Sequence, residues 1–293
     1  MDLRSEPIKW MVKDHILPVE ERVLVMGVLN LTPDSFSDGG RHLGLDAAVA
    51  RAEAIEAEGA DLLDIGGESS RPGSLPISLE EQLARVLPVI TALAGRMRIP
   101  ISVDTTKAEV ARRALELGAS IINDISALRG DPEMAGVVAR AGAGLILMHM
   151  QGTPATMQER PSYDGVVEEV LDFFRSRVKS AEAVGIDRER IAVDPGLGFG
   201  KTLEHNLALL GGLSTFAELG RPIVIGPSRK AFVGTILSRS VSEREWGTAA
   251  AIAAGILHGA HVVRVHSVAE MKDVARMSEA IRNVARGPHS IPA

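Results

Sequence analysis

Short apolar runs alternate with longer segments of mixed polarity from residue 22 to the end of the chain. The runs are apolar nearly throughout, which is typical of parallel strands that are covered by helices. The segments between them repeat apolar residues at helical spacing, so each is predicted to form a helix. The eight predicted strands are residues 22–30, 61–67, 99–104, 120–124, 144–149, 190–194, 222–226 and 261–266.

Glycines are expected to end most of these helices, because glycine tolerates the left-handed conformation that closes a helix. One helix is also expected to begin at a capping box formed by Ser78 and Glu81, whose side chains can bind free N–H groups. The helix-ending glycines lie 23 to 43 residues apart, the length of one strand–helix unit: Gly59, Gly95, Gly118, Gly142, Gly185, Gly220 and Gly259.

Eight such units in succession predict a single (β/α)8 TIM barrel, which needs about 250 residues. No shift in composition divides the chain, so we expect an N-terminal extension over residues 1–20, the barrel over 21–287 and a tail over 288–293. The alternative is an open, doubly wound sheet, which usually carries a Gly-x-Gly-x-x-Gly turn after its first strand. The first predicted strand runs into Asn-Leu-Thr-Pro-Asp-Ser-Phe instead, so the barrel is favoured.

Composition narrows the possible partners. The 293 residues carry a formal net charge of −6, which does not favour sequence-independent binding of nucleic acid. The chain has no cysteine, which excludes disulfides, thiolate metal sites and cysteine nucleophiles. No apolar run reaches the roughly 18 residues of a membrane span, and the charged N-terminus lacks a signal-peptide core. We therefore expect a cytoplasmic protein whose partners are small molecules rather than nucleic acid or membrane.

Residues 194–202, Asp-Pro-Gly-Leu-Gly-Phe-Gly-Lys-Thr, have the look of a nucleotide phosphate loop. Such a loop needs a glycine five positions before its Gly-Lys pair. Counted back from Gly200, that position is Pro195, and proline has no N–H to offer to a phosphate. The segment is therefore not predicted to bind ATP, and its role must follow from Asp194 at the end of a predicted strand.

Polar side chains gather at the carboxyl ends of the predicted strands. In a barrel these ends share one face, where the active site lies. A ring of polar groups there is costly to desolvate unless something binds to it. The residues at or just beyond these ends are Asn30, Glu68, Asp104, Asn123, Asp124, His149, Asp194, Lys230, Arg264 and His266.

The ring is expected to divide into two chemical halves, with acids and amides on one side and cations on the other. Carboxylates and amides can bind the polar edge of a flat, nitrogen-rich heterocycle. Arginine can bind an anion such as diphosphate with two parallel hydrogen bonds. The first half is Asp104, Asn123, Asp194 and Lys230; the second is Ser70, Arg71, Arg264 and His266. His149 is expected to be a core histidine.

Eight motifs resemble those of the dihydropteroate synthase family. In order they are MGVLNLTPDSFSDGG, DIGGESSRPGS, SVDTTK, INDISA, LMHMQGTP, DPGLGFGKT, PSRKAF and VRVH, and they run from residue 26 to 266. The resemblance implies condensation of 6-hydroxymethyl-7,8-dihydropterin diphosphate with 4-aminobenzoate to give dihydropteroate and diphosphate, on the way to folate. It also implies a homodimer, competition by sulfonamides and a Mg²⁺ cofactor.

The resemblance assigns a role to each matching residue. Two loops, 31–44 and 68–77, are expected to close over the site. Catalysis falls to Asp104, Asp194 and Lys230. The pterin is expected to contact Asp104, Asn123, Asp194 and Lys230; the diphosphate Ser70, Arg71, Arg264 and His266; the aminobenzoate Phe36, Pro72, Phe199 and Ser228; and Mg²⁺ Asn30.

Two alternative functions stay open at this point. One is a pterin-dependent methyltransferase, which has little need for the diphosphate-binding residues. The other is a paralogue that binds pterin without turnover. The sequence departs from the family pattern at three positions of the site. They are Ser70, where the family often has Thr, Pro227 before Ser-Arg-Lys, and Ser267 after His266.

Overall fold

The computed structural model describes residues 7–32 and 41–285 and contains the predicted parallel barrel. The strand order is β8-β7-β6-β5-β4-β3-β10-β9, and a parallel bridge between Val193 and Ile223 joins β8 to β9. Each strand begins and ends within two residues of its predicted bounds. The strands are β3 (Leu24–Asn30), β4 (Leu62–Gly66), β5 (Ile101–Asp104), β6 (Ile121–Asp124), β7 (Gly144–Met148), β8 (Ile191–Asp194), β9 (Val224–Ile225) and β10 (Val262–Val265).

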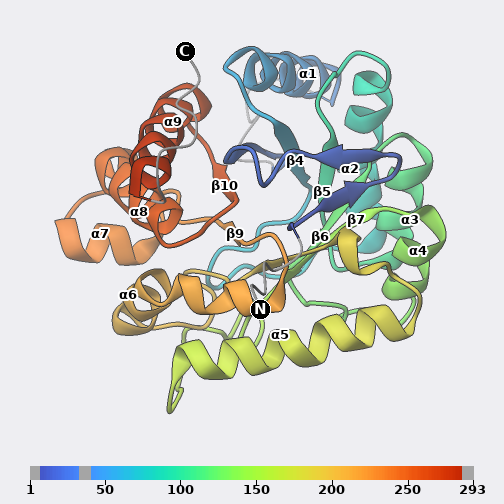
Figure 1. Ribbon diagram of the computed structural model, residues 1–293. Coiled ribbons are helices and arrows are strands. Elements are labelled where there is room, and N and C mark those ends of the chain that lie inside the picture. Colours follow the sequence, from blue (N-terminus) through green and yellow to red (C-terminus); the bar gives the residue numbers. More distant parts are fainter. Residues whose placement is uncertain (1–6, 33–40, 286–293) are drawn as a thin grey trace.

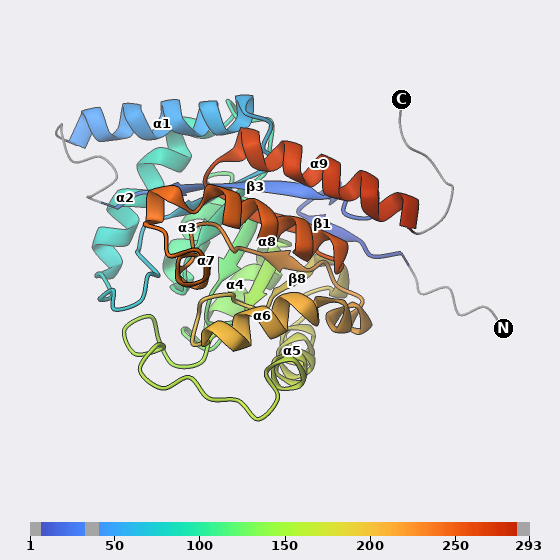
Figure 2. The ribbon, with the colours of Figure 1, turned by 90° about the vertical axis from the view of Figure 1, so that its left-hand side faces the viewer.

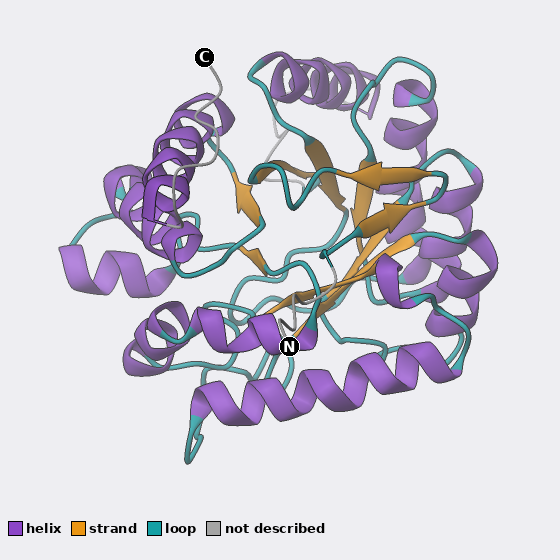
Figure 3. Cartoon of the chain, viewed as in Figure 1, coloured by secondary structure: helices purple, strands orange, loops and turns teal. Residues whose placement is uncertain are grey.

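Helices surround the strands (Figure 3). They are α1 (Arg41–Ala57), α2 (Leu79–Leu93), α3 (Ala108–Glu116), α4 (Met134–Ala141), α5 (Val166–Ala183), α6 (Leu203–Gly211), α7 (Ala231–Leu237), α8 (Glu245–Leu257) and α9 (Val268–Ala285). All seven predicted helix-ending glycines have a positive φ, as at Gly142, where φ is 56° at the end of α4. Ser78 caps α2 by accepting from the Glu81 N–H at 3.1 Å, but the Glu81 side chain pairs with Arg85. The Ser78 cap is thus confirmed, but the Glu81 side chain does not complete the predicted capping box.

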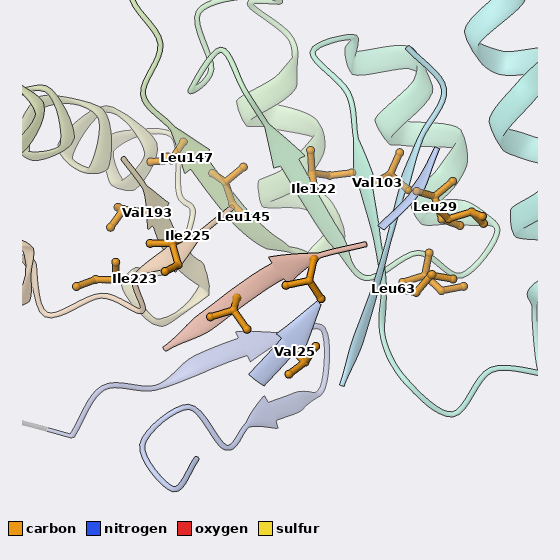
Figure 4. Packing of buried hydrophobic residues seen from close by; sticks show 14 of the residues in the cluster. Val25, Leu29, Leu63, Val103, Ile122, Leu145, Leu147, Val193, Ile223 and Ile225 are labelled. Atoms are coloured by element: carbon orange, nitrogen blue, oxygen red, sulfur yellow. The ribbon is translucent and has the colours of Figure 1, made fainter. Parts of the chain in front are cut away.

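The main hydrophobic core lies between the strands and the helices. Side chains that point out of the barrel, such as Val25, Leu63, Val103 and Ile225, pack against the apolar faces of the helices (Figure 4). Because both faces of every strand are covered, the strands can be apolar throughout, as their sequences indicated. This layer is what holds the carboxyl ends of the strands at one rim.

A second core fills the amino-terminal opening of the barrel. The expected N-terminal extension contains a hairpin, β1 (Trp10–Val12) and β2 (His15–Leu17), that lies across the barrel in Figure 1. Trp10 is fully buried among inward-facing residues such as Met26 and Ile146, and its Nε1 donates to the Arg190 carbonyl at 3.1 Å. The hairpin closes this end, so a ligand must enter from the opposite one.

The loops that follow the strands lie at that opposite end. Figure 2 shows the segment between β7 and α5 extending from this edge. The loop after β3 is shorter than the expected 31–44, because α1 already begins at Arg41. Residues 33–40 and the predicted tail 288–293 lie outside the described part of the chain. No helix in the described part combines the length and apolarity that crossing a lipid bilayer requires.

Candidate active site

Residues from six strand ends meet in one cavity at the carboxyl rim. Its volume is about 20 Å³, so a bicyclic ligand can enter only if lining side chains shift. The cavity is lined by Ser70, Asp104, Asn123, Ile125, Met148, Asp194, Gly196, Leu197, Phe199, Gly226, Lys230 and Arg264. The structure therefore brings together every residue assigned to the pterin, together with Ser70 and Arg264.

Asp64 binds two residues that line this cavity, Asn123 and Arg264, and was not singled out from the sequence. It is fully buried in the interior of β4, where its carboxylate accepts from Ser102 Oγ at 2.6 Å and from Asn123 Nδ2 at 3.3 Å. Arg264 Nε lies 2.7 Å from Asp64 Oδ2, and Arg264 also donates to Asp104 at 3.2 Å. The only signal in the sequence was an aspartate inside an otherwise apolar run.

The expected separation of acids from cations is therefore wrong for Arg264. An arginine inside the barrel must pair with a carboxylate to offset its desolvation. Arg264 does so by lying between Asp64 and Asp104, in the half of the site expected to hold acids and amides.

Asn123 has an acceptor that the protein leaves unused. Its amide donates to Asp64, which fixes the orientation of the group, and its Oδ1 is buried with no hydrogen-bond partner. Buried polar atoms are nearly always paired, so an orphan oxygen facing a cavity points to a ligand that donates an N–H.

Asp194 ends β8 and also faces the cavity. Its Oδ1 accepts from the Gly196 N–H at 2.8 Å. Burial raises the pKa of Asp194, against the opposing effects of this hydrogen bond and of Lys230. Burial likewise raises the pKa of Asp104 to about 7, with Arg264 lowering it and Asp64 raising it. The two carboxylates are thus less acidic than exposed ones.

Lys230 faces both carboxylates from the beginning of α7. Burial and the charge of Arg264 lower its pKa to about 8, while Asp194 and Asp104 raise it. Its Nζ lies over the Phe199 ring, 3.8 Å from the centroid. This cation–π contact joins the pterin-facing lysine to the aromatic ring assigned to aminobenzoate.

His266 lies among cations. Burial and the charges of Arg264, Arg229, Lys230 and Arg71 lower its pKa to about 3, so the ring is neutral. Its Nδ1 lies 2.8 Å from Ser228 Oγ, which also accepts from the His266 N–H at 3.3 Å. Ser228 is buried and faces His266, so its hydroxyl is already engaged within the protein. The aminobenzoate role implied for it stays a prediction.

The loop of residues 68–77 lies beside the cavity and contacts the β7–α5 segment. Gly73 N–H donates to the Pro154 carbonyl at 2.9 Å, while Arg71 and Pro72 are exposed. A second cavity of about 470 Å³ lies between the two segments and shares Ser70 and Asp104 with the first. Arg71 and Pro72 line neither cavity in this conformation.

Four other predicted positions are Asn30, Phe36, Asp124 and His149. Asn30 ends β3 near Gly66, and Phe36 lies outside the described residues. Asp124 accepts from the backbone N–H groups of Ser126 and Leu128, so it stabilises its own turn. His149 is buried with its ring edge-on to Phe173, which agrees with the expected core role.

Of the departures from the family pattern, Ser70 lines the cavity, and Ser267 and Pro227 make local contacts. Ser267 Oγ accepts from Arg229 at 3.0 Å, and Arg229 also pairs with Glu245 at 3.4 Å. Pro227 is buried, and its carbonyl accepts from the Lys230 N–H at 3.2 Å. None of the departures removes a residue from the cavity.

Comparison with known proteins agrees with this geometry. Residues 26–266 match the family described as pterin binding enzyme. The dihydropteroate synthase of Synechocystis sp. is 46% identical over 262 residues, which cover 89% of this chain and 91% of that protein. The chain belongs to the dihydropteroate synthase family. It is therefore a transferase of folate biosynthesis, and the family and fold predicted from the sequence are confirmed.

Solved structures of this family superpose closely. A Yersinia pestis dihydropteroate synthase in a sulfonamide drug complex has a TM-score of 0.88 and 41% identity, and the match covers 94% of this chain and 100% of that one. A Xanthomonas albilineans dihydropteroate synthase with 4-aminobenzoic acid has a TM-score of 0.87 and 43% identity, with 96% and 100% covered.

Proposed function

We propose that the cavity at the carboxyl rim condenses 6-hydroxymethyl-7,8-dihydropterin diphosphate with 4-aminobenzoate, giving 7,8-dihydropteroate and diphosphate. The observation that carries this proposal is the meeting of Asp104, Asn123, Asp194, Lys230 and Arg264 in one cavity beside a neutral histidine ringed by cations. Hydrogen-bonding groups for a heterocycle and cations for an anion thus lie next to each other.

The pterin is held by the acids, the amide and the lysine. The Asn123 Oδ1 that has no partner accepts an N–H of the ring, and Asp194 accepts from the aminopyrimidine edge. Lys230 donates to a ring acceptor. Because the cavity is small, pterin binding requires some of the lining side chains to shift from the positions seen here.

The diphosphate is held on the side of His266. The positive charges that lower the pKa of His266 are the charges that attract an anion to this point, and Ser70 adds a hydroxyl donor. Arg71 is exposed and on a loop, so it reaches the anion when the loop of residues 68–77 moves toward His266.

Mg²⁺ is the proposed cofactor. The protein offers it few ligands. A Cβ on Gly66 would lie 3.7 Å from Asn30 Oδ1 and 3.9 Å from Asp104 Oδ2, so two oxygen donors flank this strand end. Within residues 7–32 and 41–285, no group of three His, Asp or Glu could hold a metal. Mg²⁺ commonly takes one or two protein oxygens together with substrate phosphate and water. Asn30 would hold the ion there, and the ion would supply positive charge that stabilises the departing diphosphate.

The reaction breaks the bond between the pterin methylene carbon and the diphosphate oxygen, and the amine nitrogen of aminobenzoate forms the new bond. The leaving diphosphate takes the electron pair, so positive charge develops on the pterin. The carboxylates of Asp104 and Asp194 stabilise that charge in a site with little water. The aromatic amine is neutral at pH 7, so no strong base is needed to activate it. After attack its proton passes to solvent.

Aminobenzoate binds on the Phe199 side of the cavity. Phe199 is buried beneath Lys230, so its ring offers an apolar wall next to a cation that attracts a carboxylate. Pro72 joins this wall when its loop closes, and Phe36 and Ser228 complete the set that the resemblance implies. Sulfonamides are proposed to occupy the same place, as analogues of aminobenzoate.

A diphosphate-release assay with both substrates tests the proposal. We expect release that depends on aminobenzoate and Mg²⁺. A pterin-binding paralogue without turnover would release none, and a methyltransferase would transfer a methyl group instead. A sulfonamide should raise the KM for aminobenzoate without changing maximal velocity. Competition with the pterin diphosphate instead would show that the two halves are assigned wrongly.

A second copy of the chain is the proposed protein partner, and the cytoplasm the proposed location. Apolar side chains are exposed on the outer face of α7, α8 and α9: Trp246 is 86% exposed, and Met277, Ile281 and Val284 form a stripe along α9. Such a patch is typical of an interface. Sedimentation should give twice the chain mass, and Trp246→Glu should reduce it to the monomer.

A further inference from the structure

Lys201 follows the glycines that first suggested a phosphate loop, yet it does not face the cavity. Its side chain is 3% exposed. Its Nζ lies 2.9 Å from the Phe199 carbonyl, 3.3 Å from the His149 carbonyl and 3.0 Å from His149 Nδ1. Burial raises the pKa of Asp194, and the charge of Lys201 opposes that rise. Burial lowers the pKa of Lys201 to about 7, against the opposing charge of Asp194. The proposed chemistry does not use Lys201.

The three contacts suit an ammonium group. A lysine ammonium has three donors and no acceptor, and three acceptors converge on it here. Burial and the charges of Lys201 and Arg129 lower the pKa of His149 to about 2, so the imidazole is neutral and its Nδ1 accepts. Removing the ammonium would leave two buried carbonyls and a ring nitrogen without a donor.

Lys201 joins two segments that pack backbone to backbone. The positive-φ Gly196 and Gly200 are required there, because a Cβ would lie 2.0 Å from the His149 carbonyl oxygen at the first and 2.5 Å from the Gln151 carbonyl oxygen at the second. These glycines allow the β8–α6 loop to pass close to the end of β7, and Gly196 also lines the cavity.

The position of Phe199 depends on this junction. Side chains clamp the carbonyls on either side of it: Gln158 donates to the Gly198 carbonyl at 2.7 Å, and Tyr163 donates to the Gly200 carbonyl at 2.8 Å. The carbonyl of Phe199 itself is held by Lys201. The Phe199 ring in turn lies against the Lys230 ammonium at the cavity.

We propose that Lys201 is a positioning residue for the aminobenzoate half of the site: its ammonium ties the Phe199 carbonyl to the end of β7 and so holds the Phe199 ring against Lys230. The inference rests on the role proposed above for Phe199. Lysine at this point of the motif thus binds backbone carbonyls of the protein itself instead of a phosphate.

Steady-state kinetics with both substrates tests the proposal. We expect Lys201→Met to raise the KM for aminobenzoate roughly 10- to 100-fold, as small misplacements in a site do. The KM for the pterin diphosphate should change far less, because Asp194 keeps its hydrogen bond with the Gly196 N–H and Asn123 keeps its hydrogen bond with Asp64. Lys179→Met, an exposed lysine on α5, is the control and should change neither value.

A double-mutant cycle shows whether Lys201 acts through Phe199. Phe199→Ala alone should raise the KM for aminobenzoate, and adding Lys201→Met should then raise it no further. If Phe199→Ala raises this KM and Lys201→Met does not, the positioning role is overturned while the proposed function stands. If Phe199→Ala has no effect, the assignment of Phe199 is itself wrong. Equal losses for both substrates in Lys201→Met would overturn the proposal in favour of a general structural role.

The absence of cysteine from the chain allows a second test should Lys201→Met fail to fold. Lys201→Cys can be alkylated while unfolded with 2-bromoethylamine, which restores an ammonium, or with 1-bromopropane, which gives a neutral side chain of the same shape. After refolding beside the unchanged protein, the ammonium adduct should restore the KM for aminobenzoate and the propyl adduct should not. Equal behaviour of the two adducts, including equal failure to refold, would overturn the proposal that the charge positions Phe199.

Discussion

Arg264 and Asp64 form an ion pair inside the barrel, with Arg264 Nε 2.7 Å from Asp64 Oδ2 and the carboxylate fully buried. Asp64 also binds Ser102 and Asn123, so this one carboxylate orients a cation and an amide that face the cavity. Breaking a buried pair by removing one partner leaves an uncompensated charge, whereas removing both does not.

Stability should therefore depend on Arg264 and Asp64 together. Arg264→Met is expected to lower the free energy of unfolding by about 3–5 kcal/mol, because Asp64 then stays buried without its cation. Arg264→Met combined with Asp64→Asn should lose less than Arg264→Met alone. Urea unfolding followed by circular dichroism measures both, with Arg276→Met on the exposed face of α9 as a control expected to stay within about 0.5 kcal/mol. A larger loss in the double variant would contradict the charge argument.

Asp104→Asn should separate catalysis from anion binding. The substitution keeps the shape of the side chain but removes the charge that stabilises the developing cation, so kcat is expected to fall roughly 100- to 1000-fold. The Kd of inorganic diphosphate with Mg²⁺, measured by calorimetry, should change far less. Asp273→Asn, on the exposed face of α9, is the matched control. Losses of similar size in kcat and in diphosphate affinity would argue against a charge-stabilising role.

The pH dependence of kcat/KM should follow Asp104 and Lys230. Burial raises the pKa of Asp104 to about 7, so its reactive carboxylate is lost as the pH falls through that value. Burial lowers the pKa of Lys230 to about 8, so its positive charge is lost as the pH rises through that value. We expect a bell-shaped profile of kcat/KM against pH, with its maximum between these two pKa values. Lys230→Arg keeps a cation at all these pH values and should remove the alkaline limb, and a limb that persists would point to another group.

Diphosphate binding should raise the pKa of His266. In the free protein, burial and the charges of Arg264, Arg229, Lys230 and Arg71 lower that pKa to about 3. An anion among these groups offsets their repulsion of an imidazolium, so the pKa rises when diphosphate binds. Nitrogen-15 NMR of labelled histidine measures it, with His266→Gln to assign the signal and exposed His258 as the reference. An unchanged His266 would place the anion elsewhere.

The sequence alone determined the fold and the family. Each strand is a continuous apolar run because helices cover one face and the barrel interior the other, and this local pattern can be read without coordinates. The glycines that end most of the predicted helices could be read for the same reason, because a positive φ is a requirement of the backbone at each of those residues. The positions of Asp104, Asn123 and Asp194 at strand ends were also enough to bring them to one rim.

Only the tertiary structure decided which charges meet. Asp64 and Arg264 are 200 residues apart, and their pairing across the barrel depends on the registers of β4 and β10, which no local pattern encodes. The role of Lys201 could not be read from the sequence for the same reason. Its three acceptors come from two segments that β7 and β8 bring together. Local sequence fixes which conformation each backbone segment can adopt and which side chains are available, but the partner of a buried charge is a long-range contact.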